Sequence, residues 1–97
     1  MDLDAFRKSL DEDQPPAGVG RALQALWWEA RDDWDQAHRL AQAETGPDGA
    51  WVHAYLHRKE GDLSNAQFWY SRAGRAMPEV SLDAEWADIA DALLGAG

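Results

Sequence analysis

Cysteine is absent from the 97 residues of this chain, which excludes both disulfide bonds and thiolate metal sites. Long apolar runs are absent as well, and none approaches the roughly 20 residues that a membrane-spanning helix needs. The N-terminal segment MDLDAFRKSL is too acidic and too interrupted for a signal peptide. Together these absences predict a cytoplasmic protein that does not enter a membrane.

Basic residues are scarce, since nine Lys and Arg stand against 18 Asp and Glu. Nucleic-acid backbones are bound by clustered Lys and Arg, so we expect no nucleic-acid partner. The acidic excess lies at the two ends: residues 1–20 carry five acids and two bases, and residues 76–97 carry five acids and no base. Residues 21–75, with eight acids and seven bases, are nearly balanced. The acidic ends are either solvated or rest on this centre.

Catalytic and cofactor-binding motifs are also missing. None of the four serines lies in G-x-S-x-G, and neither H-E-x-x-H nor a phosphate-binding loop occurs. Gly18-Val19-Gly20 is only half of a dinucleotide-binding fingerprint, because no strand is predicted before it and no third glycine follows. We therefore expect no cofactor, and a protein without catalytic activity is favoured over an enzyme.

Apolar residues make up 45% of the chain, and six of them are tryptophans. The length suits one small domain spanning residues 1–97. Apolar residues recur at helical spacing, whereas prolines and glycines break the pattern at 11–18, at 45–49 and at Pro78. The predicted fold is therefore all-α, with about six helices. The predicted helical segments are 3–10, 19–31, 34–44, 50–60, 63–73 and 82–94.

An internal repeat relates the middle helices to one another. An offset of 29 residues places DWDQA (33–37) on DLSNA (62–66), and each segment begins with an aspartate suited to cap a helix. Two helical hairpins of one design explain this pattern. The hairpins occupy residues 21–78, between an N-terminal helix and linker (1–20) and a C-terminal capping helix (79–97).

The second hairpin resembles two known repeat families. Residues 66–73 (AQFWYSRA) are similar to the A-x-x-W-Y-x-x-A run of Sel1-like repeats. The spacing of the tetratricopeptide repeat is kept by Gly61-Asp62-Leu63, Ala66, Tyr70, Ala73 and Pro78. HAYLHRKEGD followed by WYSRAG is similar to a group of small uncharacterised bacterial proteins. The period is shorter than that of the tetratricopeptide family, and His53 and His57 replace its leucine and tyrosine. The resemblance implies a protein-binding scaffold and does not identify its protein partner.

His53, His57 and Glu60 lie at i, i+4 and i+7, on one narrow face of their helix. Two imidazoles and a carboxylate at this spacing could hold zinc together with a water molecule. They could equally point outward or satisfy buried polar atoms, and only His38 is available as a further imidazole. We therefore expect no tight metal site. A metal- or anion-binding enzyme centred on His53, His57, Glu60 and Arg58 is the alternative to the interaction scaffold.

The sequence allows two placements of His53 and His57 in the fold. Apolar spacing puts Trp51 and Tyr55 inside the domain and the histidines opposite them. The tetratricopeptide resemblance instead implies that the histidines face the partner helix. It then leaves a concave groove on the other side, lined by Trp51, Tyr55, Arg58 and Lys59. Both placements hold if the helix over 82–94 fills the groove, and we expect this arrangement.

With the groove filled, the histidines are partly buried and hydrogen-bonded, to Asn65 or Arg72. Arg58 and Lys59 either complement the dipole of a helix that stops at Gly61 or join other arginines in a patch for an anion or an acidic peptide. A homodimer is a further alternative. The candidate residues for binding a partner or ligand are His53, His57, Arg58, Glu60, Trp69 and Arg72.

Overall fold

The computed structural model describes residues 1–96. Within this range the chain forms six α-helices, one short 3-10 helix and no strand, so the predicted all-α fold of about six helices is confirmed. None of these helices is both long enough and apolar enough to cross a membrane. The elements are α1 (Leu3–Lys8), η1 (Ser9–Asp11), α2 (Arg21–Ala30), α3 (Trp34–Ala43), α4 (Pro47–Glu60), α5 (Leu63–Arg72) and α6 (Leu82–Ala96).

Helices α2–α3 and α4–α5 form two hairpins whose turns have the same geometry. Asp32 and Gly61 follow the first helix of each hairpin in the left-handed conformation, with φ of 63° and 89°. Asp33 and Asp62 come next, and the side chain of each accepts a hydrogen bond from a backbone N–H in the first turn of the following helix. The 29-residue repeat in the sequence is therefore a repeat of the turn and its cap.

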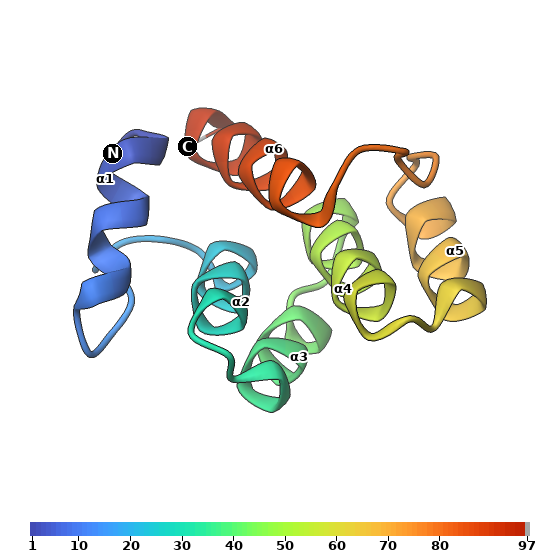
Figure 1. Cartoon of the computed structure of the whole chain (residues 1–97), viewed down its shortest axis with the longest axis horizontal. Helices are drawn as coiled ribbons and strands as arrows, with labels where there is room; N and C mark the ends of the chain where they lie inside the picture. The colour runs from blue at the N-terminus through green and yellow to red at the C-terminus, as the bar shows by residue number, and fades with distance from the viewer. Residues whose placement is uncertain (97) are drawn as a thin grey trace.

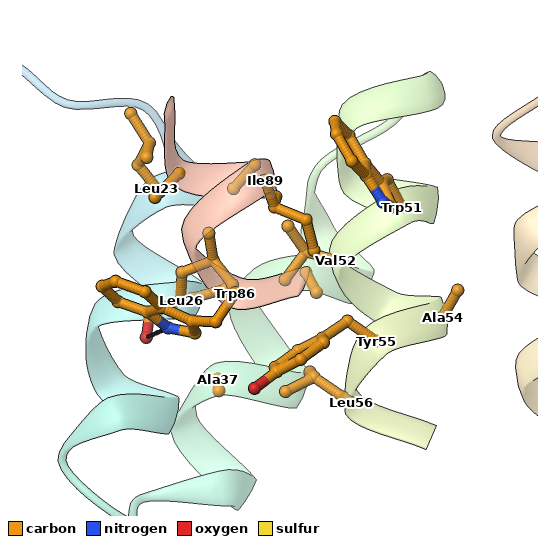
Figure 2. Packing of buried hydrophobic residues seen from close by; sticks show 14 of the residues in the cluster. Leu23, Leu26, Ala37, Trp51, Val52, Ala54, Tyr55, Leu56, Trp86 and Ile89 are labelled. Atoms are coloured by element: carbon orange, nitrogen blue, oxygen red, sulfur yellow. Dashed lines mark hydrogen bonds between the residues drawn. The ribbon is translucent and has the colours of Figure 1, made fainter. Parts of the chain in front are cut away.

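Helix α6 covers the side of the domain that α2 and α4 form. Figure 1 shows α2 to α5 following one another in an arc, with α6 lying across α2 and α4. In Figure 2, Trp86 of α6 lies beside Leu26 of α2, and Ile89 of α6 lies toward Val52 of α4. The Trp86 indole N–H donates a hydrogen bond of 3.1 Å to the carbonyl of Leu26. The C-terminal helix thus fills the groove, as the sequence predicts.

The first helix packs against the last. Phe6 of α1 is fully buried, and its ring stacks on the indole of Trp86 with 5.8 Å between ring centroids. In Figure 1 the two ends of the chain accordingly lie beside one another. The N-terminal segment is also joined to α2, where the indole N–H of Trp27 donates to the Ser9 hydroxyl at 3.1 Å.

The boundary between the hairpins differs from the predicted loop over 45–49, because α4 already begins at Pro47. Proline is tolerated in a first helical turn, where its missing N–H would have no intrahelical partner. Gly49 is buried, and a Cβ atom at this position would overlap the backbone carbonyl of Glu44. Residues 45–49 are therefore a tight helix-to-helix corner in which glycine permits close backbone contact.

Substitution of Ala66 with leucine should destabilise the α4–α5 hairpin. Ala54 and Ala66 are both fully buried, and α5 packs mainly against α4. The added side-chain volume should cost about 1–3 kcal/mol of unfolding free energy, which thermal denaturation would measure. The exposed Gln67→Leu on the same helix is the matched control and should change stability little. An unchanged melting temperature in Ala66→Leu would contradict close α4–α5 packing.

Candidate functional site

Three histidines meet between α3 and α4. His53 and His57, on α4, are 3% and 6% exposed, and His38 of α3 is half-buried beside them. The ring centroid of His53 lies 4.6 Å from that of His38 and 4.9 Å from that of His57. One ring nitrogen from each residue lies within 4.8 Å of the others. We call His38, His53 and His57 the histidine cluster.

Tryptophans fix the orientation of two imidazoles in the histidine cluster. Trp69 of α5 stacks on His53 with a centroid distance of 4.0 Å, and Trp34 of α3 stacks on His38 at 4.7 Å. The indole N–H of Trp34 donates to the carbonyl of Leu56 at 3.3 Å, which ties this ring to α4. The stacking restricts the rotation of both imidazoles.

His57 is the one member of the histidine cluster with hydrogen-bond partners among the described residues. Its Nδ1 lies 2.6 Å from a carboxylate oxygen of Glu60, and its Nε2 lies 3.4 Å from the amide nitrogen of Asn65. Because the carboxylate accepts, Nδ1 carries the proton and Nε2 keeps its lone pair. The predicted contact with Asn65 is confirmed. Arg72 makes no hydrogen bond to either α4 histidine.

Burial keeps two of the imidazoles uncharged. Desolvation, followed by the neighbouring His38 and His57, lowers the pKa of His53 to about 4. Desolvation also lowers the pKa of His38, with His57 adding to the effect and Glu60 opposing it. Both rings are therefore neutral at pH 7, when each has a nitrogen lone pair free to accept a proton or bind a metal ion.

A pocket of about 310 Å³ opens beside the histidine cluster, lined in part by His53, Trp69 and Arg72. The Arg72 guanidinium lies 5.6 Å from the ring centroid of Phe68 and 5.5 Å from that of Trp69. Phe68 itself is 53% exposed. Among the described residues Arg72 forms no salt bridge, so its charge faces solvent next to two aromatic rings.

The remaining candidate residues lie under or beside α6 and α2. Trp51 and Tyr55 are buried, and Arg58 and Lys59 pair with acids of these two helices. Arg58 contacts Glu85 at 2.8 Å, and Lys59 pairs with Glu29. The structure therefore brings Glu60 and the two α4 histidines together, but it turns the Arg58 side chain toward α6.

Two buried acids were missed by the sequence analysis. Glu85, 2% exposed, accepts hydrogen bonds from Arg58 and from the Tyr70 hydroxyl, which lies 2.7 Å and 2.6 Å from its two oxygens. Burial, reinforced by Glu85, raises the pKa of the Tyr70 hydroxyl. Glu29 is 3% exposed; burial raises its pKa, whereas Lys59 acts to lower it. Helical spacing from Leu23 and Leu26 predicts that Ala30 is buried and Glu29 exposed, yet Ala30 is exposed and Glu29 is buried.

No protein-family model, curated protein or solved structure matches this chain. Its function is therefore inferred from its own side chains and their surroundings.

Proposed function

We propose that this protein is a small, non-catalytic, tetratricopeptide-like interaction module of the bacterial cytoplasm. The proposal further assigns the binding surface to the outer face of α5, around Phe68, Trp69 and Arg72. The partner is an acidic segment of another protein that carries an apolar anchor residue. One observation carries this proposal: Arg72 lies unpaired against the exposed ring of Phe68, at the mouth of a pocket.

The concave groove is a poor candidate for this surface because α6 occupies it. Glu85 holds Arg58 and Tyr70, and Trp86 bonds to the backbone of α2. A peptide could take the place of α6 only after these buried contacts had opened, and the part of the groove that α6 leaves open is a pocket of about 490 Å³ beside Tyr55 and Lys59. The outer face of α5, by contrast, presents Phe68 with 53% of its surface exposed.

Charge favours an acidic partner for this face. Residues 63–78 contain two arginines, Arg72 and Arg75, and no acid, in a chain of net charge −9. Neither arginine forms a salt bridge among the described residues, and Arg75 lies over the ring of Trp51 at 3.4 Å from its centroid. Arg75 therefore lies toward α4, and Arg72 is the cationic group near Phe68 and Trp69. A carboxylate placed between aromatic rings would bond well to Arg72. The pocket of about 310 Å³ has room for one large side chain as the anchor.

Fluorescence anisotropy with synthetic peptides would test this proposal. The probes are labelled 12-residue peptides that combine aspartate or glutamate with one tryptophan, each matched to a version with asparagine and glutamine at the acidic positions. We expect the acidic peptides to bind more tightly, and added salt to weaken them. Arg72→Glu should reduce affinity at least about tenfold, equivalent to ~1.4 kcal/mol.

Arg39→Glu is the matched control, since Arg39 is equally exposed but lies on α3 and pairs with Gln36. It makes the same change in net charge and should leave binding unaltered. Equal losses in the two variants, or equal binding of the neutral peptides, would contradict the proposal. The alternative is that this surface binds a second copy of the chain, and sedimentation equilibrium would detect such a dimer. A dimer that Arg72→Glu dissociates would assign the surface to self-association instead.

A further inference from the structure

We propose that His38, His53 and His57 form a binding site for one zinc ion. The structure brings three imidazoles from two helices together, with one nitrogen of each within 4.8 Å of the others. His53 and His57 share one face of α4, and the third ligand comes from α3, where the first hairpin packs on the second. The zinc site shares one pocket with the proposed peptide surface, but it does not depend on peptide binding.

The composition of the histidine cluster suits zinc in particular. Zinc takes four ligands in tetrahedral geometry, and three histidines with a water molecule in the fourth position are an established combination. Zinc–nitrogen bonds of about 2.0–2.1 Å place tetrahedral nitrogens about 3.3 Å apart. The nitrogens of the histidine cluster lie within 4.8 Å of one another, so at most a short approach of the imidazoles would bring them to this spacing. His38 is half-buried and has no hydrogen-bond partner among the described residues, so it could approach the other two rings without breaking a hydrogen bond.

Glu60 is the residue that would orient the site. Its carboxylate accepts from Nδ1 of His57 at 2.6 Å, which leaves the lone pair of Nε2 for the metal. A carboxylate behind a metal-binding imidazole fixes the ring and makes it more basic. The Asn65 amide, 3.4 Å from Nε2, is the contact that the ion would replace. Glu60 is thus a positioning residue, and its side chain is 38% exposed, so it can be substituted without opening the core.

The surroundings also give an ion access to the histidine cluster. His53 lines the pocket of about 310 Å³, and its ring nitrogens have no hydrogen-bond partner among the described residues. No charged lysine or arginine bonds to any of the three imidazoles. The expectation of no tight metal site was drawn from two ligands on one helix, and the present proposal differs from it because α3 supplies a third imidazole.

The test uses the full chain without a histidine tag, stripped with a chelator and titrated with zinc chloride against a chromophoric chelator. We expect one zinc per chain. His38→Phe keeps a ring against Trp34 but removes the ligand nitrogen, and it should weaken zinc binding by more than about 100-fold, beyond the loss typical of an orienting residue. Glu60→Gln should weaken it about 10–100-fold. Cobalt in place of zinc should give the strong visible absorption of a four-coordinate ion in the wild type but not in His38→Phe.

A second group, His57, Glu60 and Asp62, also has its ligand atoms within 4.8 Å of one another, and it lies near the end of α4. His38 belongs only to the histidine cluster, so zinc binding that survives His38→Phe would move the ion to this second group and overturn the proposal. The zinc proposal would also be overturned if the wild type does not take up zinc when the protein is titrated with less than one equivalent of the ion. Circular dichroism confirms that each variant is folded, and Arg39→Gln, one position from His38 and exposed, is the control expected to keep full affinity.

Discussion

Truncation after Pro78, which deletes α6, is expected to abolish cooperative unfolding of the domain. Trp86 and Ile89 are buried, and each such side chain contributes about 1.5–3 kcal/mol relative to an exposed one. Their removal also uncovers Val52 and Tyr55 of α4 and leaves Arg58 without Glu85. The combined loss is on the order of the ~5–15 kcal/mol that stabilises a whole small domain.

Circular dichroism melts and acrylamide quenching of tryptophan fluorescence would measure this effect. The truncated chain should lose its sharp transition, and Trp51 should become accessible to the quencher. The control is Asp91→Ala in the full chain, because Asp91 is an exposed residue of α6 whose substitution should change stability little. A truncated chain with the original melting temperature and no newly accessible tryptophan would show that α6 is not part of the core.

Glu85→Ala should have the second largest effect, a loss of about 3–5 kcal/mol in unfolding free energy. The carboxylate of Glu85 is the common partner of Arg58 and Tyr70 in the seam between α4, α5 and α6. Without it, a guanidinium that is 15% exposed and a buried hydroxyl lose their partner and cannot recover full hydration. Most of the lost unfolding free energy comes from the unpaired guanidinium and hydroxyl, and less comes from the lost attraction to Glu85.

Urea denaturation of three variants would separate these contributions. Glu85→Gln keeps the volume and one acceptor for Tyr70, and it should lose less stability than Glu85→Ala. Combining Glu85→Leu with Arg58→Met removes both charges, and this pair should be more stable than Glu85→Ala. If Glu85→Ala costs under ~1 kcal/mol, as at an exposed site, the network is not the anchor of α6.

The parts of the fold that depend on local sequence could be predicted. Asp33 and Asp62 cap helices within their own turns, so an offset of 29 residues is enough to identify both hairpins. The apolar face of α6 that contains Trp86 and Ile89 must pack against another apolar surface. The groove beside Tyr55 offers such a surface. The position of α6 followed from that requirement.

The histidine cluster could not be predicted, because it depends on how two helices cross. His53 and His57 are visible as a pair on one helix, but the approach of His38 is set by the packing of α3 against α4 and by the tight corner at Gly49. The burial of Glu29 and Glu85 could not be predicted for a related reason. Each is an acid at a helical position where an exposed side chain is expected. Each pairs with a basic residue that lies far away along the chain.

The stack between Phe6 and Trp86 has a consequence for the order of folding. The two hairpins close through neighbours in sequence and can form early and fast, whereas this contact must close a loop of nearly the whole chain. The seam between α1 and α6 is therefore the last to form and the first to open. Brief separation of α1 from α6, with α6 still packed on the hairpins, would expose the rings of Phe6 and Trp86 before the protein unfolds as a whole.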